Sequence, residues 1–380
     1  MKDKRIRVLF VPHWYPTKEN RVSGIFIERQ VKAVSKYCDV AVLHVEISSE
    51  NLVSISKDNG YLEVIVYKKN RRPLSLTSFI GYLQGYKTIK ELFGQIDLFH
   101  MQVLYLGSGI FVLLESILSK KPYIISEHSS MFVEENGTFR NYSSIKKSLI
   151  RLIANKSKAI IVVSNFLKQA LEKNKINNIH VIPNIVDYLN YKSIKKNGEI
   201  KNILHISLLN DSVKNISGVL DALNEISQKR RDFKLDIIGD GKDRSFLEDK
   251  AKNYGLLGRT VFFQGIKSPL EVSHYISKCD FLVTNSNYET FSVATAEALA
   301  YGKPVIATRC GGPEDYVDKS NGLLINPKDK KALASAIEYM LDNHEKYDTK
   351  LIRKEAKNKF SSEVIGERIF GFYINILNKK

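Results

Sequence analysis

Short apolar runs alternate along this chain with longer segments whose apolar residues recur at helical spacing. A buried strand of a parallel sheet gives a continuous apolar run, and the helix that leads to the next strand gives an amphipathic segment. The alternation therefore predicts an α/β protein with mostly parallel sheets. In the first half of the chain the strand patterns are RVLFV (7–11), DVAVLHV (39–45), LEVIVY (62–67), IDLFHMQ (96–102), PYIISEH (122–128), AIIVVS (159–164) and IHVIPN (179–184), with helical patterns at 24–37, 78–93, 109–119, 142–156 and 165–173.

Residues 188–201 (YLNYKSIKKNGEIK) interrupt the alternation, because they lack apolar periodicity and are rich in Lys and Asn. We interpret them as a linker. A chain of 380 residues is long enough for two domains with separate cores. We expect an N-terminal domain at 1–187, a C-terminal domain at 202–360 and a terminal helix at 361–380. The patterns of the second half lie at 202–207, 233–241, 260–265, 281–283, 304–308, 328–341 and 363–377.

The composition limits the cellular setting. The chain has 58 Lys and Arg against 41 Asp and Glu, a formal charge of +17, which favours contact with polyanions without choosing among them. Cys38, Cys279 and Cys310 are far apart and form no C-x-x-C pair, which argues against a disulfide framework or a zinc site. The apolar run at 8–11 is too short for a signal peptide, and no stretch approaches the roughly 18 apolar residues of a membrane span. We therefore expect a cytoplasmic protein.

The stretch 281–312 (FLVTNSNYETFSVATAEALAYGKPVIATRCGG) joins two predicted strands through a polar loop and a short helix. Ser292 is suited to be the N-cap of this helix and Gly302 its C′ residue, and Pro304 ends it. The loop thus lies at the carboxyl end of a strand and enters a helix N-terminus. Ligands bind at this edge of open α/β sheets, and free amides, here Phe291 to Val293, favour an anion.

Two carboxylates mark this stretch, Glu289 in the loop and Glu297 in the helix. A solvated loop acid and a surface helix acid are the simplest interpretations. The small apolar residues around Glu297 indicate instead a helix packed on several sides, in which an acid needs a partner. Spacing alone leaves the structural and functional interpretations open.

The pattern S-x-x-E-T-F-S-x-x-x-x-E-A-L-A-x-G-x-P-V-I-A at 286–307 resembles the E-x7-E signature of retaining, nucleotide-sugar-dependent glycosyltransferases of family 4. The resemblance implies the GT-B fold, in which two Rossmann-like domains face each other across a cleft and the terminal helix crosses back to the first. It implies transfer of a sugar from a UDP- or GDP-sugar to a glycan or lipid-linked acceptor, as in bacterial cell-surface polysaccharide synthesis. It also implies that the enzyme needs no cofactor and no divalent metal.

The resemblance assigns roles to particular positions. Lys214, the loop at Gly24 and the amides at 291–293 would stabilise the donor diphosphate. Glu289 would position the donor sugar, and Glu297 would hold the ribose hydroxyls. For Lys214 the alternative is a solvated loop lysine, and for Gly24 an ordinary glycine at the start of a helix.

Further positions follow the family with less specific motifs. His128, which ends the pattern PYIISEH, resembles a histidine that orients the reacting hydroxyls, and the backbone near Ile266 resembles the segment that contacts the base. His100 resembles a second common histidine. His13 and Trp14 would line the acceptor cleft, or else be buried. A structural hydrogen bond is the alternative role of His128.

The chain also departs from the family. Leu208 stands where the family has an arginine that acts together with the lysine, so Lys201 or Arg309 would have to supply the second cation, or Lys214 would act with less help. Ser23 stands where many members have a second glycine beside Gly24, which leaves the exact phosphate contact open.

The segment GDGKDR (239–244) follows a strand pattern as a dinucleotide-binding turn would. Arg244 occupies the place of the third glycine of G-x-G-x-x-G, and the next strand ends in Gln264 and Gly265, not in an acid that would hold a ribose. NAD binding is therefore disfavoured, and a glycine turn near the nucleotide fits better.

Two basic segments lie in the first half, KKNRR (68–72) and the helix at 142–156 with Lys146, Lys147, Arg151 and Lys156. They are either solvated faces or a peripheral attachment to anionic lipid on the inner face of the plasma membrane. No recognition motif supports nucleic-acid binding. A nucleotide-sugar epimerase of the same architecture and a non-catalytic polyanion-binding module remain alternative functions.

Overall fold

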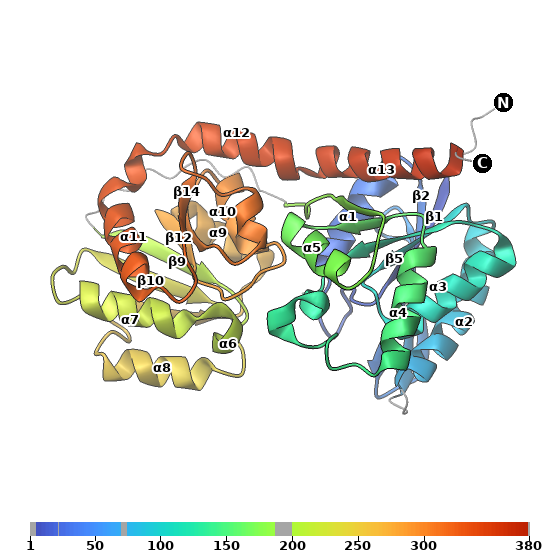
Figure 1. The fold of residues 1–380 in the computed structure, drawn as a ribbon, viewed down its shortest axis with the longest axis horizontal. Helices are drawn as coiled ribbons and strands as arrows, with labels where there is room; N and C mark the ends of the chain where they lie inside the picture. Colours follow the sequence, from blue (N-terminus) through green and yellow to red (C-terminus); the bar gives the residue numbers. More distant parts are fainter. Residues whose placement is uncertain (1–4, 22, 70–73, 187–199, 379–380) are drawn as a thin grey trace. The chain divides into compact units, whose positions relative to one another are not determined.

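The computed structural model describes residues 5–378, apart from residues 22, 70–73 and 187–199. The chain forms two units, one of Met1–Ile185 with Ser362–Lys380 and one of Val186–Ser361 (Figure 1). Each unit is built around a parallel sheet with helices on its faces, so the predicted α/β class is confirmed. All three cysteines are free and buried.

The sheet of the first unit has the strand order β3-β4-β2-β1-β5-β6-β7-β8, with β3 antiparallel to β4 and the other neighbours parallel. The sequence pattern did not predict β3, because this edge strand is half exposed and places Leu52 and Ile55 in solvent. The strands are β1 (Arg7–Pro12), β2 (Asp39–Ser48), β3 (Leu52–Ser56), β4 (Leu62–Lys69), β5 (Leu98–Gln102), β6 (Tyr123–Glu127), β7 (Ile160–Val162) and β8 (Ile179–Val181).

The helix α2 begins four residues earlier than the pattern at 78–93 predicts. Gly81 and Gly85 face the sheet, where an added Cβ would come within 2.7 Å of Val45 and 2.4 Å of Leu43. These glycines therefore let the helix approach the sheet closely. The helices of this part are α1 (Ile25–Ser35), α2 (Leu74–Phe93), α3 (Leu106–Ser119), α4 (Ser144–Lys156) and α5 (Asn165–Lys173).

The last helix, α13 (Ser362–Asn378), belongs to the first unit although it follows the second in sequence (Figure 1). It packs on α1, where Gly366 lies so close to Ala33 that an added Cβ would be 3.0 Å from its carbonyl oxygen. Tyr373 is completely buried, and its hydroxyl lies 2.7 Å from Nδ1 of His100 on β5. The helix is thus part of the core of the first unit.

The sheet of the second unit has the order β11-β10-β9-β12-β13-β14, all parallel. Most of the predicted linker at 188–201 lies outside the described residues, and Lys201 already begins a strand. The elements are β9 (Lys201–Ile206), α6 (Asp211–Lys214), α7 (Ile216–Ile226), β10 (Phe233–Ile238), α8 (Arg244–Asn253), β11 (Val261–Gly265), α9 (Pro269–Lys278), β12 (Phe281–Thr284), α10 (Val293–Ala300), β13 (Val305–Thr308), β14 (Gly322–Ile325), α11 (Lys330–Asn343) and α12 (Thr349–Phe360).

Each sheet has one point at which the chain changes direction across it. The chain builds outward from β1 through β2 to β4 and then continues on the other side of β1 with β5. In the second unit the same change occurs between β9 and β12. Loops separate at such a switch point and leave a crevice at the carboxyl ends of the strands, where open α/β sheets bind ligands. The topology therefore directs the search for a site to these two places.

The contact between α13 and β5 can be tested with Tyr373→Phe, which leaves Nδ1 of buried His100 without its partner. We expect the free energy of unfolding of the first unit to fall by about 1–3 kcal/mol. Tyr37→Phe is the matched control, because its hydroxyl makes a longer, exposed hydrogen bond of 3.4 Å to α13. Trp14, the only tryptophan in the chain, reports unfolding of this unit by fluorescence in urea. Equal losses in both variants would contradict this role of Tyr373.

Candidate active site

An ion pair joins the two loops at the switch point of the second unit. Lys214 ends α6, which follows β9, and Glu289 lies in the loop that follows β12. Nζ of Lys214 lies 2.5 Å from Oε1 of Glu289, and Oγ of Ser286 donates to the same oxygen at 2.8 Å. Both charged side chains are largely enclosed, at 20% and 13% exposure. The structure thus brings together two residues that the sequence predicted separately.

A histidine beneath this pair ties the two switch strands together. Nδ1 of His205 on β9 lies 2.9 Å from the carbonyl oxygen of Val283 on β12, and Nε2 lies 2.8 Å from Oγ of Ser207. Because a carbonyl only accepts, the neutral ring donates from Nδ1 and accepts at Nε2. Burial lowers the pKa of His205 to about 4. The ring is therefore a neutral structural link, and the sequence analysis did not identify it.

The backbone holds Glu289 in place through a short parallel bridge to the loop after β13. Its N–H donates to the carbonyl of Cys310 and its carbonyl accepts from Gly312, both at 2.8 Å. An added Cβ on Gly312 would lie 2.4 Å from Cα of Phe291, so only glycine allows this approach. The paired glycines that end the stretch 281–312 therefore fix the loop that carries the carboxylate.

The helix α10 begins where the sequence predicts, but different hydrogen bonds hold its N-terminus. Ser292 is its N-cap in position, yet it has left-handed dihedrals (φ 65°) and its side chain bonds the hydroxyl of Thr295 at 2.8 Å instead of a backbone amide. Tyr316 donates to the carbonyls of Phe291 and Ser292 at 2.5 and 2.9 Å. The predicted N-cap position of Ser292 is thus confirmed, but its side chain caps no backbone amide. The amides of Phe291, Ser292 and Val293 donate to no backbone acceptor among the described residues, as expected at a helix N-terminus.

The end and the body of α10 agree with prediction. Gly302 has φ 75° and donates to Leu299, and Lys303 donates to Ala298, which together form a Schellman motif. No residue of α10 is exposed, so the predicted packing on several sides is confirmed. Glu297 lies in this helix and is partly buried. Its contact with a donor stays a prediction.

The structure separates the two cations that were considered in place of the family arginine. Leu208, at the expected position, is 66% exposed in the loop after β9. Lys201 lies at the opposite, amino end of β9 and pairs with Asp232 at 3.3 Å, so it cannot act at the switch point. Arg309 follows β13 at the carboxyl edge, is half exposed and lies 3.8 Å from Glu314. Of these two candidates, Arg309 is therefore the one at the carboxyl edge of the sheet, where the switch-point loops lie.

The glycines of the GDG turn serve a close contact between two loops. An added Cβ on Gly239 would lie 1.9 Å from the carbonyl oxygen of Ser207, and one on Gly241 would lie 2.5 Å from that of Leu209. This contact explains the glycines without a dinucleotide. Ile266, which follows β11 at the same edge, is 70% exposed, and its contact with the base stays a prediction.

Gly24 in the first unit has a complete structural explanation. It is the N-cap of α1 with φ 67°, and an added Cβ would lie 2.4 Å from the carbonyl oxygen of Trp14. Any other residue would be strained and would collide with the loop after β1. The proposed contact of this loop with a donor phosphate stays a prediction.

His100 and His128 of the first unit are buried, and burial keeps both rings neutral by lowering their pKa. Nε2 of His128 lies 3.0 Å from Oε1 of Gln102, and burial lowers the pKa of His128 to about 3. His100 is deeper in the core, between Tyr373 and Ser126, so it stabilises the fold. His13 stacks on Tyr105, with ring centroids 3.9 Å apart. His128 therefore supplies no positive charge, and its contact with a reacting hydroxyl stays a prediction.

The sequence analysis missed the carboxylate beside His128. Glu127 is buried and accepts hydrogen bonds from the backbone N–H groups of Leu104, His128 and Ser129, at 2.8, 2.9 and 2.6 Å. Burial raises its pKa to about 7 in spite of these donors. It also fixes the loop in which Val103 has φ 67°, a rare value for a β-branched residue. The sequence feature that could have identified Glu127 was the presence of an acid inside the apolar run PYIISEH.

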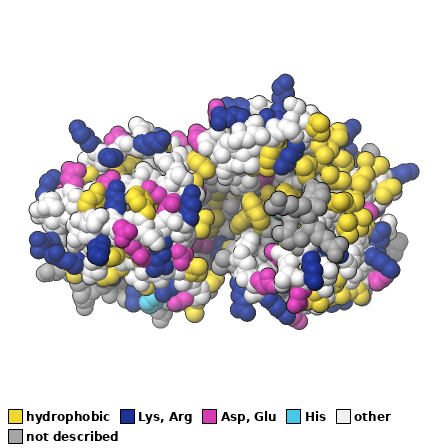
Figure 2. Space-filling view, turned by 90° about the horizontal axis from the view of Figure 1, so that it is seen from below, with side chains coloured by type: hydrophobic (Ala, Val, Ile, Leu, Met, Phe, Trp, Pro, Cys, Tyr) yellow, Lys and Arg dark blue, Asp and Glu magenta, His cyan; other side chains and the backbone are white. Residues whose placement is uncertain are grey.

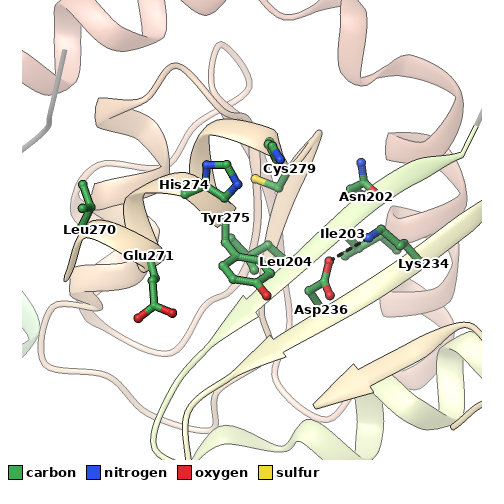
Figure 3. A pocket seen from close by; sticks show the side chains of 11 residues that line it. Asn202, Ile203, Leu204, Lys234, Asp236, Leu270, Glu271, His274, Tyr275 and Cys279 are labelled. Atoms are coloured by element: carbon green, nitrogen blue, oxygen red, sulfur yellow. Dashed lines mark ion pairs between the residues drawn. The ribbon is translucent and has the colours of Figure 1, made fainter. Parts of the chain in front are cut away.

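A separate cavity of about 560 Å³ lies beside α9 in the second unit. Figure 3 shows side chains of α9, among them His274 and Tyr275, on one side and the ion pair of Lys234 and Asp236 on the other. The cavity is also lined by Asn202, near the amino end of β9, so it does not include the switch-point loops. Within the described residues, no cluster of His, Cys, Asp and Glu side chains is suited to hold a metal ion.

Known proteins share this architecture. The family model "Glycosyltransferase Family 4" matches residues 38–188, and "Glycosyl transferases group 1" matches residues 189–358. An uncharacterised glycosyltransferase of Methanocaldococcus jannaschii is 31% identical over 322 residues, which cover 82% of this chain and 86% of that protein. The alpha-monoglucosyldiacylglycerol synthase of Streptococcus pneumoniae is 26% identical over 328 residues, which cover 79% of this chain and 70% of that protein.

Among solved structures, Anabaena HepE in complex with UDP aligns with a TM-score of 0.77 at 18% identity, covering 97% of this chain and 100% of that one. A likeness at this identity shows the fold, and the family models together with the archaeal relative show the family. The chain belongs to the family 4-type glycosyltransferases and has the GT-B fold.

Proposed function

We propose that this glycosyltransferase moves a sugar, with retention at the anomeric carbon, from a nucleoside diphosphate donor that binds at the switch point of the second unit. The observation that carries the proposal is the enclosed pair of Lys214 and Glu289 beside the N-terminal amides of α10. A cation and free amides at one place suit a diphosphate. The solved HepE structure is a complex with UDP, which supports this class of ligand, and GDP is the alternative.

The proposed mechanism follows from the charge that develops during transfer. As the bond to the sugar breaks, negative charge grows on the leaving diphosphate and the sugar becomes oxocarbenium-like. Lys214 and the amides at 291–293 stabilise the phosphate, because fixed charges and dipoles in an enclosed site need little reorganisation. Glu289 positions the donor sugar. Lys214, which pairs with Glu289 in the structure, turns toward the phosphate when the donor binds.

The remaining contacts place the nucleoside and the acceptor. Glu297 accepts hydrogen bonds from the ribose hydroxyls, and the backbone at Ile266 meets the base. His128 orients the reacting hydroxyls as a neutral hydrogen-bonding group, which its burial and its contact with Gln102 support. The proposal includes no bound metal. The acceptor is a glycan or a lipid-linked group in cell-surface polysaccharide synthesis. The name of the similar synthase of Streptococcus pneumoniae includes a lipid, which agrees with a lipid-linked acceptor and does not exclude a glycan.

Thermal unfolding in the presence of UDP, GDP, ADP and their sugar conjugates tests the donor site. We expect one nucleotide to stabilise the second unit, by about 2.7 kcal/mol at 100 times its Kd. Glu297→Ala should weaken that nucleotide about tenfold or more, through lost hydrogen bonds to the charged carboxylate. Glu289→Gln should keep nucleotide binding and lower transfer on the order of 100-fold.

Glu338→Gln is the matched control, because Glu338 pairs with Lys229 at 3.7 Å on the surface of the same unit. It should change neither binding nor transfer. The absence of a shift with every nucleotide would overturn the donor site, and a free sugar product without an acceptor would indicate an epimerase.

We also propose peripheral attachment to an anionic lipid surface through the first unit. The helices α2 and α3 pack against each other, as do α3 and α4, and all three expose large apolar side chains. Figure 2 shows hydrophobic side chains gathered over this unit. We call this surface the α2–α3–α4 face; the exposed apolar residues of its helices are Leu76, Ile80, Leu83, Leu92, Leu114, Ile117, Leu118, Ile145 and Leu152.

The same helices and their ends also carry exposed lysines, including Lys87 and Lys90 on α2, Lys120 after α3 and Lys156 on α4. Apolar area together with basic groups is the combination that binds anionic lipid. Of the predicted basic run at 68–72, only Lys68 and Lys69 lie within the described residues. No described helix has the length and apolar composition that a bilayer crossing requires.

Sedimentation of the full chain with vesicles tests this attachment. We expect binding to phosphatidylglycerol-containing vesicles at low salt, weaker binding at high salt because of screening, and little binding to neutral phosphatidylcholine vesicles. Ile117→Ser with Leu118→Ser should reduce the bound fraction, because these side chains are 64% and 76% exposed. Phe246→Ser, at an exposed residue of α8, is the control. If the wild-type chain stays in the supernatant with anionic vesicles, the attachment is excluded.

A further inference from the structure

A second cavity, of about 330 Å³, lies in the first unit at the loop that follows β6. It is enclosed by this loop, which includes two short 3-10 turns (Ser130–Phe132 and Glu134–Asn136), and by α4 and α5. Its size is at the lower end of the range for small-molecule sites, which suits a unit of one or two sugars better than a long polymer. Neither the donor site nor the α2–α3–α4 face includes its lining residues.

The floor of the cavity is aromatic. Phe132 and Phe139 are buried, with ring centroids 4.8 Å apart, and Phe166 of α5 adds a partly exposed ring. Ligand pockets combine such apolar walls with a few polar groups that fix orientation. The Phe132 and Phe139 rings are tilted by 41° against each other, and the guanidinium of Arg151 lies 5.6 Å from the centre of the Phe139 ring. The floor therefore offers apolar contacts to a ligand directly beside a cation.

The rim of the cavity is positively charged. Arg140 belongs to the loop, Lys147 and Arg151 to α4, and Lys173 to α5. Lys147 donates to the carbonyl of Arg140 at 2.6 Å, and Nε of Arg151 donates to that of Asn174 at 2.9 Å, so backbone oxygens hold both cations at the rim. Across the described residues, no carboxylate oxygen lies within 4.0 Å of the side-chain nitrogens of these four residues.

The rim also has Glu134 and Glu135, both exposed, so the four cations exceed the acids by two. Cations that converge without paired carboxylates attract an anion, and Arg at the rim suits a planar carboxylate or a phosphate. The basic helix at 142–156 was predicted to be either a solvated face or a site of attachment to anionic lipid. Two of its cations, Lys147 and Arg151, line this cavity instead.

Only a few residues of chain separate the cavity wall from His128, which the proposed function places at the acceptor. His128 ends the strand region of β6, and Ser129 caps the turn that carries Met131 and Phe132 into the cavity wall. Oγ of Ser129 accepts from the N–H of Met131 at 3.0 Å, and Glu127 binds the N–H groups of both His128 and Ser129. A ligand in the cavity would thus contact the same loop that positions His128.

We infer that this cavity binds an acidic sugar residue of the acceptor, with the ring on the aromatic floor and its carboxylate or phosphate at the cationic rim. The inference rests on the proposed transfer to a glycan and adds the chemical class of that glycan. The exposed apolar residues Ile145 and Leu152 of α4 do not line the cavity, so a lipid surface is not its occupant.

Saturation-transfer NMR titrations of the full chain test the inference with methyl glucuronide, glucose 6-phosphate and methyl glucoside as probes. We expect at least one acidic probe to bind fivefold or more tightly than neutral methyl glucoside, and the better of the two identifies the carboxylate or the phosphate. Arg140→Gln with Lys173→Gln should weaken it at least fivefold. Phe166→Ala should weaken all three probes.

Lys168→Gln with Lys175→Gln is the charge-matched control, because it removes two positive charges near α5 that do not line the cavity. Equal binding of methyl glucoside, or equal losses in the control and the rim variant, would overturn the inference. Thermal shift of the rim variant with nucleotides separates the two proposals. A preserved nucleotide shift without acidic-sugar binding refutes the cavity alone, whereas loss of the nucleotide shift in the wild-type chain refutes the donor site.

Discussion

The ion pair of Lys214 and Glu289 is the interaction on which the second unit's site depends. Either charge alone, enclosed at the switch point, would cost several kcal/mol, so each keeps the other in place. The pair also fixes the loops after β9 and β12 relative to each other, above the neutral link from His205. A diphosphate that takes Lys214 frees Glu289 for the sugar. Donor binding and release of the Glu289 carboxylate from Lys214 then occur in the same step.

Both units have a switch point in the sheet, but the chemical groups at the two switch points differ. Both have a switch point at the first strand of the sheet, and both use glycine for close loop contacts there, Gly24 in the first unit and Gly312 in the second. The second unit adds a cation and helix amides. The first has the neutral rings of His100 and His128 and the buried carboxylate of Glu127, which accepts hydrogen bonds from backbone N–H groups. This difference fits a division between an anionic donor and an acceptor that is held by hydrogen bonds.

The sequence predicted what burial and spacing determine directly. Central strands are buried on both faces, so their apolar runs were unmistakable, whereas the edge strand β3 is half exposed and was missed. The positions of Ser292 and Gly302 followed from helix-end chemistry, but the left-handed backbone of Ser292 depends on Tyr316, which no local pattern reveals. Lys201 was considered for the donor site although it directly precedes the strand pattern at 202–207, which already places it at the amino end of that strand. The rim of the acidic-sugar cavity joins three separate segments, and only the folded chain brings them together.

Hydrogen–deuterium exchange with and without a saturating nucleoside diphosphate tests the central claim most directly. If the donor binds at the switch point of the second unit, exchange should slow at the loops after β9 and β12 and at the first turn of α10, at residues 207–214 and 286–296. The cavity beside α9 should be unaffected. Unchanged exchange at these loops, with protection at α9 instead, would contradict the account.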